Sequence, residues 1–151
     1  MDLERTLPTR GQLERQLSQT VQALYRSEFG HLPSKVVCHL FADRVAIIAE
    51  NTTTTIEQIL FDNSRLDLAH EIRVAISETF IGQVKQAAAD ILQVEAVDAI
   101  CDSTLDSGYL GMIIFLKNAP SVRMAKKERR QSKTVAFSQD GQSHSTVSLE
   151  D

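Results

Sequence analysis

The chain has 151 residues, of which 42% are hydrophobic, so it is long enough for one domain with a sizeable core. Its net charge is −4, and residues 1–120 carry 10 Lys and Arg against 16 Asp and Glu, which argues against nucleic-acid binding through a basic face. No apolar run approaches the roughly 20 residues that span a bilayer, and the N-terminus lacks the pattern of a secretion signal, so we expect a cytoplasmic protein with no transmembrane segment.

A helix followed by a β-hairpin is expected first. Residues 11–28 carry apolar side chains at steps of three and four, such as Leu17 and Val21, which is the spacing of one helical face. Two runs rich in Val and Ile follow, at residues 35–41 and 45–50. Because only three residues separate them, they predict two antiparallel strands joined by a tight turn.

Two helices are expected next. Thr54 and Glu57 have the spacing of a capping box, which predicts a short helix over residues 55–61. Residues 65–93 contain no proline and carry a long apolar stripe, which predicts a second helix. The two starts lie ten residues apart, so we expect a bend at residues 62–63 rather than one continuous rod.

Residues 94–102 and 109–117 predict two further strands, separated by a polar turn. The second of these runs is apolar at every position from Tyr109 to Leu116, apart from Gly111, so both of its faces look buried. The fold class is therefore expected to be α+β, with a mixed or antiparallel four-stranded sheet covered by helices. Either the first helix or a second subunit must cover the remaining face, and the second alternative predicts a homodimer.

The chain divides into three expected regions: a flexible N-terminus at residues 1–10, the α+β domain at 11–120, and a tail at 121–151. The tail is rich in Ser, Lys and Gln and poor in large apolar residues, a composition typical of disorder. Its basic cluster is a candidate contact for an acidic partner or an anionic membrane surface, and the alternative is a solvated tail with no partner. The cluster comprises Arg123, Lys126, Lys127, Arg129, Arg130 and Lys133.

Few residues suggest chemistry. No phosphate-binding loop, nucleophile elbow or zinc motif is present, and no cofactor or metal site is expected. Arg73 lies at the edge of the long helix's apolar stripe, where a structural salt bridge with Asp67, Glu71 or a strand carboxylate is the favoured interpretation. The sharper alternative is a ligand-binding or catalytic pocket at the sheet edge formed by Glu57, Arg73 and Asp102.

Several short motifs follow one another along the chain: a Gly-x-x-Pro turn at residues 30–33 before the first hairpin, the Thr54 to Leu60 helix start, Arg73 in the long helix, and the closing strand at 113–116. Together they resemble the MpsC family, a bacterial group of small domains of unknown function. The family is associated with a membrane-potential-generating system whose partner subunits take up dissolved inorganic carbon.

The resemblance implies a soluble accessory or regulatory protein, linked to bicarbonate uptake and acting through protein–protein contacts. We therefore expect no enzymatic activity and an unidentified protein partner in a membrane transport system, while the expected homodimer rests on the two apolar faces of the last strand. The alternatives are a small-molecule or anion-binding sensor and a small enzyme that uses the pocket at the sheet edge.

Overall fold

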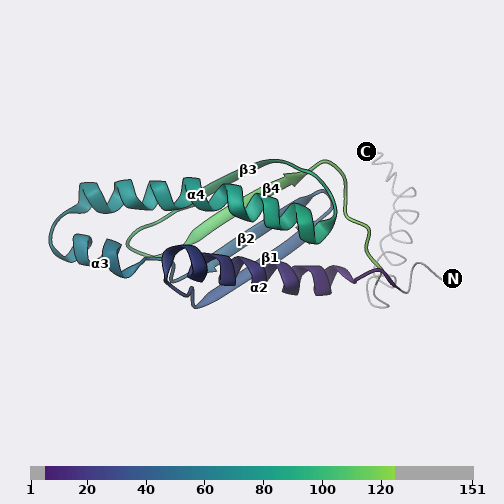
Figure 1. Ribbon diagram of the computed structural model, residues 1–151, viewed down its shortest axis with the longest axis horizontal. Coiled ribbons are helices and arrows are strands. Elements are labelled where there is room, and N and C mark those ends of the chain that lie inside the picture. Colours follow the sequence, from purple (N-terminus) through teal and green to yellow (C-terminus); the bar gives the residue numbers. More distant parts are fainter. Residues whose placement is uncertain (1–5, 125–151) are drawn as a thin grey trace, which may run out of the picture. The chain divides into compact units, whose positions relative to one another are not determined.

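The computed structural model describes residues 6–124. Residues 11–121 form one compact unit, and residues 6–10 and 122–124 belong to a second. Within the second unit, the backbone N–H of Arg123 donates to the carbonyl of Pro8 at 2.8 Å. The elements are α2 (Arg10–Phe29), β1 (Lys35–Phe41), β2 (Arg44–Glu50), α3 (Thr55–Asp62), α4 (Leu66–Leu92), β3 (Ala96–Ser103) and β4 (Leu110–Leu116) (Figure 1).

The four strands form one antiparallel sheet in the order β1-β2-β4-β3. This arrangement confirms the expected α+β class and makes β4 a central strand. Alternate residues on β2 and β4 and at the end of β1 are buried, as period-two geometry requires, whereas edge strand β3 has no fully buried residue. On β4, for example, Met112 and Ile114 are buried, whereas Gly111 between strands β2 and β3 is exposed.

Helices α2 and α4 lie over the same face of the sheet (Figure 1). Tyr25 of α2 packs edge-to-face on Phe80 of α4, with ring centroids 5.2 Å apart. Helix α2 is also bonded to edge strand β1, because the backbone N–H of Cys38 donates to the Ser18 hydroxyl at 3.1 Å. The core therefore lies between this helix pair and one face of the sheet.

Within residues 6–124, the expectation that both sheet faces are buried is not met. Helix α2 packs beside α4 rather than against the opposite face, so none of the described helices covers that face. We call it the open face: the side chains that point away from α2 and α4. Ile48 and Ile100 on the open face are 53% and 55% exposed. The apolar residues of β4 fill the core on one side and stand on an uncovered surface on the other.

The capping-box signal for the start of α3 and the expected bend before α4 are confirmed. Thr54 and Glu57 form the capping box that opens α3. The chain bends before α4, with Ser64 in the left-handed region at a φ of 59°. At the other end of α4, Gln93 adopts the left-handed conformation typical of a helix C-terminus.

Candidate functional site

A buried ion pair joins the two helices that flank the bend. Arg73 of α4 and Glu57 of α3 have only 3% and 0% of their side-chain surface exposed. The Arg73 Nη2 donates to Glu57 Oε1 at 2.5 Å, and its Nε donates to Oε2 at 2.6 Å. This two-bonded geometry is the strongest arrangement available to an arginine and a carboxylate.

The same pair is bonded to the loop between β2 and α3. The Glu57 carboxylate accepts from the backbone N–H of Thr54 at 3.0 Å and from its hydroxyl at 2.8 Å. Arg73 also donates to the hydroxyl and the carbonyl of Thr52, both at 3.0 Å. Four Arg73 hydrogen bonds therefore end inside the protein, and the charges are balanced and enclosed.

Tyr25 and Gly108 complete the cluster. The Tyr25 hydroxyl donates to the carbonyl of Thr52 at 2.5 Å, and the Thr52 hydroxyl donates to the carbonyl of Gly108 at 2.8 Å. Burial raises the pKa of Tyr25 above its ordinary value, although the nearby Arg73 charge acts in the opposite direction. The cluster thus ties α2, the β2–α3 loop, α4 and the β3–β4 turn together.

The prediction that Arg73 pairs with Asp67, Glu71 or a strand carboxylate was wrong. The partner is Glu57, sixteen residues earlier in the chain. Sequence reasoning also missed Thr52 and Tyr25 as members of the cluster. The only available signal was the run of four threonines that leads into α3, which supplies hydroxyl groups at a point where the chain enters the core.

Asp102 does not join this ion pair but shares a cleft with Arg73. The cleft lies between α4 and β3, has a volume of about 410 Å³, and is also lined by His70, Glu78 and Ser103. Asp102 stands exposed at the edge strand, whereas Glu57 is not among the lining residues. The three predicted site residues therefore do not form one pocket. Arg73 pairs with the enclosed Glu57 and also lines the open cleft, which it shares with Asp102.

The two cysteines carry free thiols. Burial raises the pKa of Cys38 to about 11 and that of Cys101, which lines the cleft, also to about 11. A thiol with such a pKa is mostly protonated near neutral pH and is a weak nucleophile. Within residues 6–124, no group of three or more His, Cys, Asp or Glu side chains is placed to hold a metal ion.

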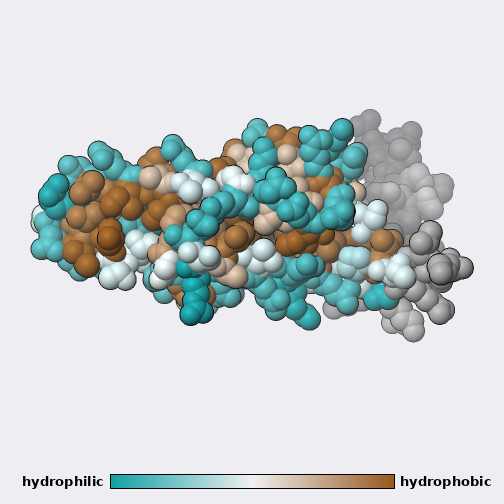
Figure 2. Space-filling view, viewed as in Figure 1, coloured by the Kyte–Doolittle hydropathy of each residue, from teal (hydrophilic) through white to brown (hydrophobic). Residues whose placement is uncertain are grey.

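A second apolar surface lies on α3 and the start of α4, where Figure 2 shows hydrophobic side chains gathered. We call this the arm patch, and its members are 39–60% exposed: Ile56, Ile59, Phe61 and Leu66. Exposed acidic residues, Asp62, Asp67 and Glu71, lie close by in the sequence. An apolar surface of this kind is typical of a contact site for another molecule.

Of the basic cluster predicted in the tail, only Arg123 falls within the described part of the chain. Lys126, Lys127, Arg129, Arg130 and Lys133 lie outside the described residues, as does most of the region expected to be disordered. Their proposed role in binding a partner stays a prediction.

Comparison with known proteins identifies one family. The family model described as "Na+-translocating membrane potential-generating system (MpsC)" matches residues 9–118. No curated protein and no solved structure is significantly similar to the chain. Among residues 6–124, no helix combines the length and apolar content needed to cross a membrane.

Proposed function

The chain belongs to the MpsC family, and we propose that it is a non-enzymatic accessory or regulatory protein of a membrane transport system. In this proposal it works in the cytoplasm, through protein–protein contacts, and is linked to inorganic-carbon uptake. The observation that carries the proposal is the contrast between its polar and apolar features. The polar cluster around Arg73 is closed by internal hydrogen bonds, whereas the open face and the arm patch expose large apolar side chains.

The two apolar surfaces suit two different occupants. A second copy of the chain covers the open face, which makes the protein a homodimer. The arm patch then remains for the transport partner. Because acidic residues flank it, the surface it fits is an apolar protein surface with basic neighbours, and an anionic lipid surface would be repelled.

Uptake of labelled bicarbonate tests this role in cells whose own copy of the gene is deleted and that express the chain from a plasmid. Ile59→Asp places a charge in the centre of the arm patch and should abolish restoration of uptake, while the protein still folds. The matched control is Thr55→Asp, which adds the same charge to an exposed position in the first turn of α3, where an acid is favourable. Uptake that is equal in the two variants, or that never depends on the chain, would refute the proposal.

The cleft between α4 and β3 favours a second candidate, a small-molecule or anion-binding sensor or a small enzyme. Asp102 and Glu78 line it together with Arg73 and His70, so it gathers one cation, two carboxylates and one imidazole. Arg73 has little left to offer a ligand, because four hydrogen bonds already hold it. Bicarbonate titrated into labelled protein should shift the His70 resonances if this candidate is right and leave them unmoved if the contact-based role is right.

A further inference from the structure

The register of the sheet places the open-face residues in rows across the strands. In one row, Ile48 of β2 lies beside Gly111 of β4, which lies beside Asp102 of β3. A second row lies four residues away along each strand and contains Arg44, Phe115 and Asp98. These rows decide which residues of a second copy can meet which residues of the first.

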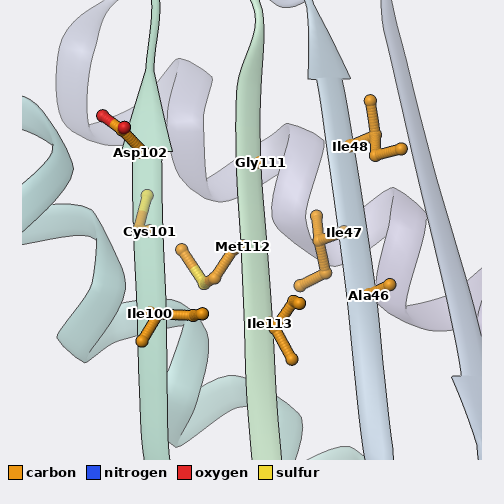
Figure 3. Close-up of a pocket in the computed structure, with 9 residues that line it drawn as sticks. All are labelled: Ala46, Ile47, Ile48, Ile100, Cys101, Asp102, Gly111, Met112 and Ile113. Carbon is orange, nitrogen blue, oxygen red and sulfur yellow. The ribbon is translucent and has the colours of Figure 1, made fainter.

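Gly111 creates a hollow in the open face. It has no side chain, and a Cβ built there would meet nothing within 4 Å. The hollow has a volume of about 370 Å³ and is bordered by Ile48, Ile100 and Ile113 (Figure 3). Ile48, on the neighbouring strand and in the same row, is 53% exposed. The face thus carries a projecting apolar side chain and an apolar recess next to each other.

Charge is distributed unevenly across the same face. The β1–β2 half carries Lys35, His39 and Arg44 together with one acid, Glu50. The Arg44 guanidinium sits 5.4 Å from the centre of the Phe115 ring. Asp98 and Asp102 lie on the opposite edge strand, β3. A second copy therefore fits best when its β1–β2 half lies over the β3 half of the first.

We propose that two copies pack open face to open face about a two-fold axis that runs parallel to the strands, between β2 and β4. This inference rests on the proposed homodimer and specifies its geometry. Rotation about that axis keeps each row at its own level and reverses the strand order. Ile48 of each copy consequently enters the hollow over Gly111 of the other, and the basic half of each copy faces the acidic half.

The other in-plane two-fold axis, perpendicular to the strands, gives a poorer fit. It would lay β3 over β3 and so bring Asp98 and Asp102 of one copy toward the same acids of the other. Like charges facing each other across an interface are unfavourable and disfavour that arrangement. It would also leave Ile48 opposite a β2 strand, with no recess to receive it.

The size of the face is close to the lower limit for a specific dimer. Seven-residue strands extend about 23 Å and four strands side by side extend about 19 Å, at roughly 3.3 and 4.8 Å spacing. The projected area is thus about 440 Å² per copy, and its corrugated accessible surface is larger, near the lower limit of roughly 600 Å² per partner for specific interfaces. Two sheets packed this way lie about 10 Å apart with their strands within about 30° of parallel.

Sedimentation equilibrium of the full chain tests the geometry through a size exchange. Gly111→Ile fills the hollow and should weaken the dimer about tenfold or more, because Ile48 of the other copy loses its space. The double variant Gly111→Ile with Ile48→Ala moves the large side chain from one strand to the other and should restore the dimer. Circular dichroism confirms that each variant is folded, which the empty surroundings of Gly111 favour.

A charge at position 48 distinguishes this geometry from dimerisation through another surface. Ile48→Asp should raise the dimer Kd about 100-fold. The matched control is Val74→Asp on α4, because Val74 is 55% exposed but lies off the sheet. A wild-type dimer that is insensitive to Ile48→Asp and Gly111→Ile overturns this geometry and leaves the homodimer intact. A wild-type chain that stays monomeric overturns both, whereas the transport role is judged separately by the Ile59→Asp uptake experiment.

Discussion

Glu57 and Arg73 form an enclosed ion pair across the bend between α3 and α4, with two N–O distances of 2.5 and 2.6 Å. A buried pair of this kind adds little net stability over well-packed apolar residues, but removal of one partner leaves the other charge unpaired in the core. The pair therefore fixes where α3 lies, and with it the arm patch, at a point where few apolar contacts could do so.

Arg73→Met should lower the free energy of unfolding by about 3–5 kcal/mol, because it leaves the Glu57 carboxylate buried without its cation. Urea denaturation measures this loss. Arg15→Met, at an exposed position of α2, is the control and should change stability by less than about 0.5 kcal/mol.

The double variant Glu57→Met with Arg73→Met removes both charges together. It should recover much of the stability lost in Arg73→Met, because no unpaired charge remains. A loss in the double variant that equals the sum of the losses in Arg73→Met alone and Glu57→Met alone would contradict the ion-pair interpretation.

Substitution of two glycines by alanine should change the stability of the protein in opposite directions. Gly108 has a φ of 71°, and a Cβ there would lie 3.2 Å from the Thr53 hydroxyl. Gly108→Ala should therefore destabilise the protein by at least about 1 kcal/mol. Gly82→Ala, in the open middle of α4, should stabilise it by about 0.5–1 kcal/mol in the same thermal-unfolding experiment.

Stability should fall as the pH rises above the ordinary thiol range. Burial raises the pKa of Cys38 and of Cys101 from 9.0 to about 11, so the folded state holds these protons more tightly than the unfolded state. The resulting stabilisation is fully present below pH 9 and is lost as the pH approaches 11. Urea unfolding at about pH 8 and about pH 10.5 measures the fall. Other basic groups also titrate in this range, so the fall in wild type has more than one source.

The contribution of each thiol is isolated by comparison with its alanine variant. Cys38→Ala should lower stability at both pH values, because it opens a small cavity in the core, but should make the fall with pH less steep. An identical pH slope in wild type and variant would show that the Cys38 thiol does not contribute.

The tail prediction concerns residues 121–151. If the basic cluster strengthens the contact with an acidic partner, a chain truncated after residue 120 should bind the transport partner more weakly, and added salt should reduce the difference. Equal binding of the full-length and the truncated protein at low salt would show that the tail does not contribute to this contact.

The sequence predicted the helices and strands well because each has a strong local signal. The Thr54–Glu57 capping box fixed the start of α3, and the Val- and Ile-rich runs fixed the strands to within a few residues. The pairing of Arg73 with Glu57 was beyond local reasoning, since it depends on how sharply the chain turns between two helices. A stripe of apolar spacing also could not reveal that an arginine occupies a buried position on α4.

The same limit applies to the sheet faces. The apolar residues on both sides of β4 showed that two surfaces need covering, but not whether a helix of the same chain covers each one. Only the position of α2 beside α4, through Tyr25 and Phe80, decides that question. The hollow at Gly111 likewise depends on the register, which places a glycine between Ile48 and Asp102.

The central claim is that this protein works through its contact surfaces rather than through chemistry in a cleft. The most direct test is bicarbonate uptake in cells that lack the chain and express either Ile48→Asp, which disrupts the open face, or His70→Ala, which alters the cleft between α4 and β3. The account predicts that Ile48→Asp fails to restore uptake and that His70→Ala restores it. Restoration by Ile48→Asp together with failure of His70→Ala would contradict the account.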